Sequence, residues 1–430
     1  MPSPPASVAE AIAPARLGRG FRLLLAATIV TNVGDGIALA AGPLLVASQT
    51  RDPFLVSLAA LSQYLPVLLF GVAAGTAADR LDRRRIVALV NLVRAAVLGA
   101  LAATIASGTV GISSILIALF ALGTAETFAD VTSSSLMPRL VRREDLGIAN
   151  ARMTSAVILT NQLAAPPVGA VLFTIGMALP FATDAACFAL GAVIVSRIAL
   201  EPAGDRRPDA GSGPGSNGLR AEMAEGLRWL LAHPPMRTLA LTIVAFNVTF
   251  GAAWSVLVLY AQERLGMSAV GFGLLTTAMA IGGLAGTSVY GRLERRFSLA
   301  DIMRVGLLIE TTMHLVLALT TSAAVALVMF VVFGAHAFVW GTTSTVVRQR
   351  AVPDELLGRV TGVYTVGSIL GIVIGTPIGG LLAGRFGITA PFWFGFVGSA
   401  VLVTLLWGQF AKIVHSADAA ASPRVAMPER

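Results

Sequence analysis

Ionisable side chains interrupt several of the long apolar runs in this sequence of 430 residues. A charged group at the centre of a bilayer costs roughly 2.5–3.5 kcal/mol on insertion scales, so it is expected to face a cavity or a partner. Such a group is suited to binding a proton or a charged ligand. Asp35 lies near the middle of its run and is our first choice for this role. The full set of candidates is Asn32, Asp35, Arg94, Glu126, Asp130, Asp184, Glu310 and His314.

Several of these candidates have a structural alternative. Asp130 and Asp184 lie nearer the ends of their runs, where a hydrogen-bonding role in the fold is equally well supported. Glu310 and His314 are one helical turn apart on the same face, and we favour a local pair over a proton relay. His336 is interpreted as a packing residue, and Arg94 could neutralise one of the acids.

Other kinds of chemistry find little support in the sequence. Aromatic residues such as Phe246 and Trp340 could stack on a substrate ring, but at helical spacing packing is the favoured interpretation. The single cysteine excludes a disulfide within the chain and a cysteine-built metal site. No G-x-x-x-x-G-K-S/T loop is present, which argues against direct use of ATP. We expect no cofactor and no bound metal.

The elements that must position these residues are twelve apolar segments. The chain is 56% hydrophobic and only 13% charged, whereas soluble domains carry about 25% charged residues. A hydrocarbon core of about 30 Å needs about 20 helical residues per crossing, so the chain is long enough for twelve. We expect transmembrane helices over 22–46, 54–74, 86–107, 112–133, 151–173, 177–198, 238–260, 268–290, 301–320, 323–346, 360–383 and 390–411.

Basic residues fix the orientation. Of the 31 Lys and Arg residues, 26 fall in the termini and loops of one side, whereas Arg51, Arg264 and Arg385 fall on the other. Arg94 and Arg152 lie inside helices. The positive-inside rule therefore places both termini in the cytoplasm. Because the positive charge is spread around the rim of a membrane domain, a nucleic-acid partner is excluded.

The two halves of the sequence are related by an internal repeat. An offset of 211 positions pairs Gly75 with Gly286, and it also pairs Arg84-Arg85 with Arg295-Arg296. Two six-helix repeats about an axis along the membrane normal are typical of transporters whose halves rock about a central site. We expect an all-α polytopic membrane protein of two pseudo-repeats. The predicted parts are a cytoplasmic tail (1–21), a bundle (22–200), a cytoplasmic linker with an amphipathic helix (201–237), a second bundle (238–411) and a second tail (412–430).

One loop carries a family resemblance. The stretch from Gly75 to Arg85, Gly-Thr-Ala-Ala-Asp-Arg-Leu-Asp-Arg-Arg-Arg, resembles the G-x-x-x-D-R-x-G-R-R signature of the major facilitator superfamily, with Asp82 in place of the second Gly. A decayed copy covers Gly286 to Arg296. The stretches 129–150 and 184–188 resemble the bacterial efflux branch that includes enterobactin exporters and macrolide efflux pumps.

The resemblance implies roles for further residues. In this superfamily the loop is a lock of the cytoplasm-closed state, here Gly75, Asp79, Arg80, Arg83 and Arg84; alternatively, the arginines only hold the loop inside, and Asp82 caps the next helix. The fifth and eleventh helices contain elements similar to the G-P-x-x-G-G element of antiporters. Helix bending and ordinary small-residue packing are both open for its residues, Pro166, Gly169, Pro377 and Gly380.

These observations favour a secondary exporter of the bacterial cytoplasmic membrane. We expect it to act as a monomer and to exchange protons for an amphipathic small molecule, such as a drug or a siderophore, by alternating access. Asp35 and Glu126 should then border an aqueous chamber. An importer or a lysolipid flipper on the same fold is the main alternative, and a membrane sensor that transports nothing is less favoured.

Overall fold

The computed structural model describes residues 15–134, 136–199 and 216–421, and within these ranges the chain is helical and contains no strand. The N-terminal half contains η1 (Ala15–Leu17), α2 (Gly18–Gln49), α3 (Pro53–Arg80), α4 (Arg83–Ala106), α5 (Ile112–Ser134), α6 (Met137–Leu140), η2 (Arg143–Asp145), α7 (Leu146–Val157), η3 (Ile158–Ala164), α8 (Ala165–Ile175) and α9 (Leu179–Ser196). The C-terminal half contains α10 (Ser216–Ala232), α11 (Pro234–Trp254), α12 (Leu257–Leu259), η4 (Tyr260–Arg264), α13 (Ala269–Arg296), α14 (Leu299–Leu319), α15 (Ala323–Ala351), α16 (Asp354–Phe386), α17 (Ala390–Leu406) and α18 (Gln409–Ala421).

The membrane-spanning helices match the expected number. Eleven stretches of the described chain are long and apolar enough to cross a bilayer, and a twelfth is obtained when α17 and the start of α18 are counted as one span. The expected span over 390–411 is a broken one, because this pair is bent by 60° at a break after Leu406. Gly408 lies in the break, and Phe410 and Ile413 beyond it are buried in the core of the C-terminal half. Burial of these two side chains accounts for the turn away from the axis of α17.

Local signals in the sequence set many of the helix ends. Asp52 caps α3 by accepting a hydrogen bond from the backbone N–H of Phe54, and Asp82 caps α4 through Arg84 and Arg85. A carboxylate is a preferred N-cap because it satisfies backbone donors that the first turn leaves unpaired. The expectation that Asp82 caps the following helix is confirmed. At the other end of a helix, Gly387 closes α16 with a φ of 92°, which favours glycine.

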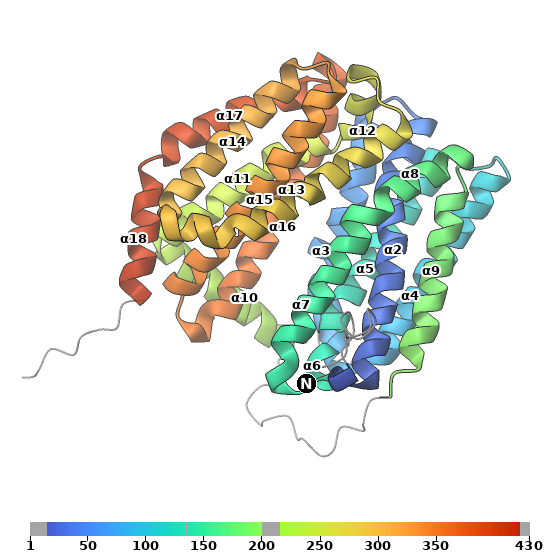
Figure 1. Ribbon diagram of the computed structural model, residues 1–430, viewed down its shortest axis with the longest axis horizontal. Coiled ribbons are helices and arrows are strands. Elements are labelled where there is room, and N and C mark those ends of the chain that lie inside the picture. The colour runs from blue at the N-terminus through green and yellow to red at the C-terminus, as the bar shows by residue number, and fades with distance from the viewer. Residues whose placement is uncertain (1–14, 135, 200–215, 422–430) are drawn as a thin grey trace, which may run out of the picture. The chain divides into compact units, whose positions relative to one another are not determined.

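The chain divides into two compact units. Unit 1 comprises Met1–Gly213 and Ala261–Thr277, and unit 2 comprises Pro214–Tyr260 and Ala278–Arg430. Within unit 1, α4 packs on α9 and α2 packs on α8 (Figure 1). Within unit 2, α14 packs on α17 and α11 packs on α16. These pairs join the third span to the sixth and the first to the fifth in each half, so the packing inside the units follows the internal repeat.

Apolar side chains cover much of the outside of the helices. Leu89 on α4, Ile117 on α5 and Leu405 on α17 are each more than 60% exposed. Such exposure is unfavourable in water but suits contact with lipid tails, which are as apolar as these side chains. The exposed residues therefore agree with a bilayer as the surrounding solvent.

The predicted amphipathic helix after the linker is present as α10, and it belongs to unit 2. It packs on α16: Glu225 pairs with Arg359 at 2.7 Å, and Leu230 is buried in the core of the unit. Leu227 and Leu231 remain about half exposed. Part of the predicted apolar face is thus used for packing, and the rest is free to face a membrane surface.

Candidate functional site

A cavity of about 500 Å³ lies within unit 1 and is lined by the charged residues of its helices. Asp35 comes from α2, Arg94 from α4, and Glu126 and Asp130 from α5. Both expected chamber residues, Asp35 and Glu126, therefore border open space. The wall also carries neutral polar side chains, namely Thr28, Thr31, Asn32, Asn91, Ser133, Asn150 and Asn161.

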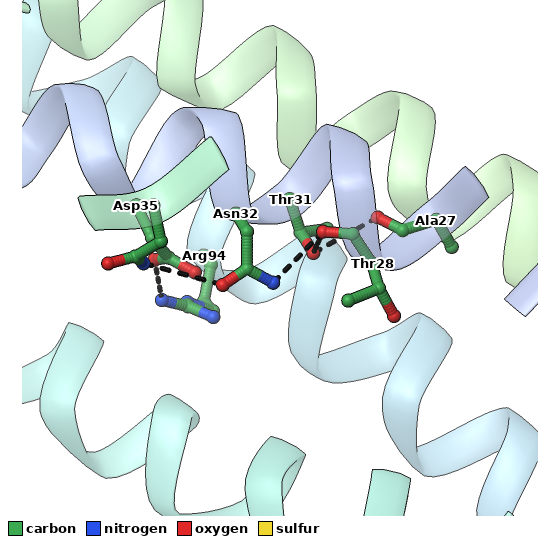
Figure 2. Close-up of polar contacts among 7 residues, drawn as sticks. Ala27, Thr28, Thr31, Asn32, Asp35 and Arg94 are labelled. Carbon is green, nitrogen blue, oxygen red and sulfur yellow. Dashed lines mark hydrogen bonds and ion pairs between the residues drawn. The ribbon is translucent and has the colours of Figure 1, made fainter. Parts of the chain in front are cut away.

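Asp35 forms an ion pair with Arg94. A guanidinium nitrogen of Arg94 donates a hydrogen bond to Oδ1 of Asp35, and Figure 2 shows the two side chains pointing toward each other. The other face of the guanidinium lies 3.9 Å from the ring centroid of Phe188 on α9. The Arg94 side chain is 8% exposed and that of Asp35 is 23% exposed. The pair thus lies at the cavity wall with the carboxylate on the more open side.

Neutral amides continue the polar wall along α2. Asn32 lies one turn before Asp35 and donates to the carbonyl of Thr28 at 2.9 Å (Figure 2). Asn161 on η3 donates to Oδ1 of Asn32 at 3.4 Å. Asn161 was not singled out from the sequence, because a neutral amide in an apolar run carries a weaker signal than a charge.

One arginine serves four acids. Arg94 pairs with Asp35, shares the cavity wall with Glu126 and Asp130, and lies within electrostatic range of Asp184. Glu126 and Asp130 are exposed to the open space, whereas Asp184 on α9 is 2% exposed. One carboxyl oxygen of Asp184 has no hydrogen-bond partner among the described residues. The cluster therefore contains more acidic groups than its single cation can neutralise.

A second acid is buried within unit 2, away from any cation. Glu310 on α14 is fully buried, and neither of its carboxyl oxygens has a hydrogen-bond partner among the described residues. Nδ1 of His314 lies 3.4 Å from Oε1, and Nε2 of His336 on α15 lies 3.8 Å from Oε2. The structure thus brings together Glu310 and His314, the two residues of the expected local pair. It also places His336 of α15 beside Glu310, a contact that the sequence did not indicate.

A second cavity, of about 330 Å³, lies within unit 2 among α11, α15 and α16. Its wall contains the aromatic rings of Phe246, Trp340 and Tyr364 and the cationic side chain of Arg348. No Asp or Glu is among its lining residues. Neither Arg348 nor Tyr364 was among the candidates from the sequence. Arg348 falls in the cytoplasmic loop that follows the helix expected over 323–346. In the part of the chain that the structure describes, no group of three or more His, Cys, Asp or Glu side chains is arranged so that it could hold a metal ion.

Comparison with known proteins identifies the family. Residues 9–430 match the model of the family described as transmembrane secretion effector. The chain belongs to this family of the major facilitator superfamily. It is 28% identical to the multidrug efflux pump Tap of Mycolicibacterium fortuitum over 386 residues, which cover 86% of this chain and 90% of Tap. It is 26% identical to the enterobactin exporter EntS of Escherichia coli O1:K1, with 84% and 85% of the two chains covered.

Solved structures of transporters share the fold. A bacterial homologue of the iron transporter ferroportin, in its inward-facing state, matches with a TM-score of 0.69 at 18% identity, covering 92% of this chain and 98% of that one. The nucleoside transporter NupG matches with a TM-score of 0.69 at 12% identity over 92% of this chain and 99% of its own. These structures show the fold alone; the family match and the similarity to Tap and EntS show that the protein is an efflux transporter of the major facilitator type and not an enzyme.

The signature loop of this transporter is only partly described. The side chains of Asp79 and Arg80 lie outside the described residues. Arg84 donates to the backbone carbonyl of Ile198 at 3.0 Å, which ties the start of α4 to the end of α9. A Cβ added at Gly75 would meet no atom within 4 Å. Packing therefore does not require a glycine at position 75, and the lock function of Gly75, Asp79, Arg80, Arg83 and Arg84 stays a prediction.

The two proline–glycine elements differ in local structure. In unit 1, Pro166 follows the π-helical segment η3, whereas in unit 2 α16 continues as a single helix through Pro377. A proline ring clashes with the preceding turn, and a π-turn is one way to relieve that clash. A Cβ added at Gly169 would collide with the backbone of Ile37, so this glycine permits the close approach of α8 to α2. Gly380 is buried within α16.

Proposed function

We propose that this protein is a secondary active exporter that exchanges protons for an amphipathic small molecule by alternating access. The observation that carries the proposal is the surplus of acids over cations in the cavity of unit 1. Asp35, Glu126 and Asp130 line the cavity with one cation, Arg94, and Asp184 on α9 is buried with an unpartnered oxygen. A buried carboxylate without a partner costs several kcal/mol, so such a cluster favours uptake of a proton or a cationic group.

Asp35 is the best placed group for coupling. It borders the cavity, it is the direct partner of Arg94, and it is within electrostatic range of Asp184. A proton on Asp35 would free Arg94 to pair with another acid of the cluster. Protonation would then change which side chains are held together, as coupling of protons to a conformational change requires. Glu126 and Asp130, exposed on α5, are assigned to cationic substrates or to proton delivery.

The relatives and the charge distribution support the remaining parts of the proposal. The names of the relatives, a multidrug efflux pump and an enterobactin exporter, support an amphipathic drug or siderophore-like compound as substrate. The excess of basic residues on one side supports a multi-pass protein of the bacterial cytoplasmic membrane with both termini in the cytoplasm. We assign the function to the monomer.

Transport by the purified full-length chain in phosphatidylcholine vesicles tests the proposal. Ethidium serves as a fluorescent probe, and an imposed pH gradient serves as the energy source. We expect ethidium to accumulate in a vesicle lumen that is more acidic than the medium, and we expect a proton ionophore to abolish the accumulation. Accumulation that ignores the gradient would contradict proton coupling.

The direction of transport is tested in cells. A strain lacking the protein should retain more ethidium than the same strain complemented with it, and its susceptibility profile would narrow the range of substrates. Lower retention in the deletion strain would favour the importer instead. A lysolipid flipper would move labelled lysolipid but not ethidium in the same vesicles.

A further inference from the structure

The cavity of unit 2 occupies the same repeat positions as the charged cavity of unit 1. Nine of its thirteen lining residues lie 211 positions after a residue that lines the cavity of unit 1. The same offset relates the two halves of the sequence, so the two cavities are built on corresponding faces of corresponding helices. Such agreement is expected when two repeats keep a common ligand-binding surface.

The side chains at the matched positions differ in charge. The three acids of unit 1, Asp35, Glu126 and Asp130, correspond to Phe246, Ala337 and Gly341 in unit 2. In the other direction, Met137 and Met153 correspond to Arg348 and Tyr364. The surface of unit 2 thus has no carboxylate, and it carries one arginine and the aromatic rings of Phe246, Trp340 and Tyr364.

Arg348 is held in place without a carboxylate. Its Nη1 donates to Oγ of Ser344 at 3.1 Å, and its Nη2 donates to Oγ1 of Thr345 at 3.3 Å. The guanidinium carbon lies 3.8 Å from the ring centroid of Tyr364, and the hydroxyl groups of Tyr364 and Ser344 are 2.8 Å apart. Hydroxyls and a ring face orient an arginine but leave its charge uncompensated.

Two nitrogen donors of the residues on this wall have no hydrogen-bond partner among the described residues. They are Nε of Arg348 and Nε1 of Trp340, and both are buried. The rings of Phe246 and Trp340 are parallel within 11°, with centroids 6.0 Å apart. The other titratable groups on the wall are Tyr364 and His336, and neither carries negative charge at neutral pH in its ordinary form.

We propose that the cavity of unit 2 binds an oxyanion, such as a carboxylate or a phosphate, attached to an aromatic ring of the transported molecule. Arginine is suited to the anion because its N–H groups match two oxygens, and the rings supply stacking surface. The volume of about 330 Å³ is within the range of small-molecule sites. This inference rests on the proposed transport function, which supplies the reason for a ligand to enter. The phosphate of a lipid headgroup has the same anionic chemistry and is the rival occupant.

Binding of salicylate to the purified protein in phosphatidylcholine nanodiscs tests the assignment without requiring transport. Isothermal titration would measure the affinity, and quenching of tryptophan fluorescence that is lost in Trp340→Phe would locate the bound ring. Benzamide serves as the neutral aromatic control. We expect salicylate to bind at least tenfold tighter than benzamide, because a charge-assisted hydrogen bond typically contributes that much.

Two substitutions separate charge from folding. Arg348→Gln should weaken salicylate binding at least tenfold and change benzamide binding less than about threefold. Gly341→Asp restores the acid of the matching position Asp130, and a Cβ at Gly341 meets no atom within 4 Å. It should also weaken salicylate selectively, whereas Gly341→Asn should not. Size-exclusion profiles that match the wild type would show that each variant is folded.

Three results would overturn the inference: equal affinity for salicylate and benzamide, no salicylate binding up to about 10 mM, or wild-type salicylate affinity in both Arg348→Gln and Gly341→Asp. Competitive loss of salicylate binding when phosphatidylglycerol replaces phosphatidylcholine would assign the site to a lipid headgroup and overturn the substrate assignment. Failure of the proposed function is seen separately, as absence of gradient-driven ethidium transport. Charge-selective salicylate binding could persist in that case.

Discussion

The cavities of unit 1 and unit 2 are built on matching positions of one repeat but present opposite chemistry. The cavity of unit 1 holds Asp35, Glu126 and Asp130 around Arg94, whereas the cavity of unit 2 holds Arg348 among aromatic rings and no acid. The pairing of the third span with the sixth and of the first with the fifth is found in both halves, whereas the side chains on the cavity walls differ. The repeat thus sets the position of the cavity in each unit, and a few side chains on each wall set its charge.

The buried acids of the two units differ in the same way. Asp35 meets a guanidinium at the edge of an open cavity, so protons and ligands have access to it. Glu310 is fully enclosed, and its carboxyl group lies beside the imidazole rings of His314 and His336. Access and the presence of a cation therefore favour Asp35 as the coupling residue and Glu310 as a structural one.

The largest expected effect comes from neutralising Asp35 in the cavity of unit 1. Asp35→Asn removes the carboxylate that pairs with Arg94, so we expect at least a tenfold loss of ethidium efflux from cells. Asp52→Asn is the matched control, because asparagine is as good an N-cap as aspartate and Asp52 lies outside the cavity. Wild-type efflux and coupling in Asp35→Asn would remove Asp35 from the mechanism and leave the fold unaffected.

Removing Arg94, the cation of the unit 1 cavity, should mainly affect the free energy of unfolding. Arg94→Met leaves several acids without a partner, and breaking a buried ion pair in this way costs about 3–5 kcal/mol. Combining it with Asp35→Asn should restore part of the loss, with a coupling energy of about 0.5–3 kcal/mol. Unfolding in SDS-containing mixed micelles measures both quantities. Simple additivity of the two substitutions would show that the pair is not an energetic unit.

Two glycines in unit 1 distinguish a glycine that close helix packing requires, Gly169, from a glycine that belongs only to a sequence motif, Gly75. Gly169→Ala places a Cβ against the backbone of Ile37 and should cost about 1–3 kcal/mol, because α8 must move away from α2. Gly75→Ala meets no atom and lies within α3, so it should stabilise the protein by about 0.5–1 kcal/mol. The same unfolding measurement tests both. Equal effects at the two positions would contradict the packing of α8 on α2.

The smallest effect is expected at the enclosed acid of unit 2. Glu310→Gln keeps the shape of a side chain whose oxygens have no hydrogen-bond partner among the described residues, so its stability should change by less than about 1 kcal/mol. Ethidium efflux should stay within threefold of the wild type. A loss as large as that of Asp35→Asn would mean that both units bind coupling protons, and the contrast between them would fail.

Much of this fold follows from the sequence, because long apolar runs and the distribution of arginines are strong signals for membrane spans. The break between α17 and α18 was not predicted, since both flanking segments are apolar enough to continue as one helix. Asp35 and Arg94 could be selected as charges within apolar runs, but their pairing depends on how α2 and α4 are rotated. Helices that are apolar on most sides carry little information about that rotation.

The missed residues have the same physical origin. The contact of His336 with Glu310 depends on which faces of α14 and α15 pack against each other. The spacing of residues along one helix does not give this information. Asn161 lies in a π-helical segment, where the register of side chains departs from the usual 3.6-residue period. Arg348 could have been found by adding 211 to the position of Met137, which lines the cavity of unit 1. The repeat predicts that corresponding helix faces line corresponding cavities.

Simultaneous recording of proton and ethidium movement in the same vesicles tests proton exchange by the acids of unit 1 most directly. Vesicles containing the wild-type protein and a pH-sensitive dye would receive ethidium from outside. We predict that the lumen becomes more alkaline as ethidium enters, and that this change is absent with Asp35→Asn and retained with Asp52→Asn. Entry of ethidium into wild-type vesicles with no change in lumenal pH would contradict proton exchange.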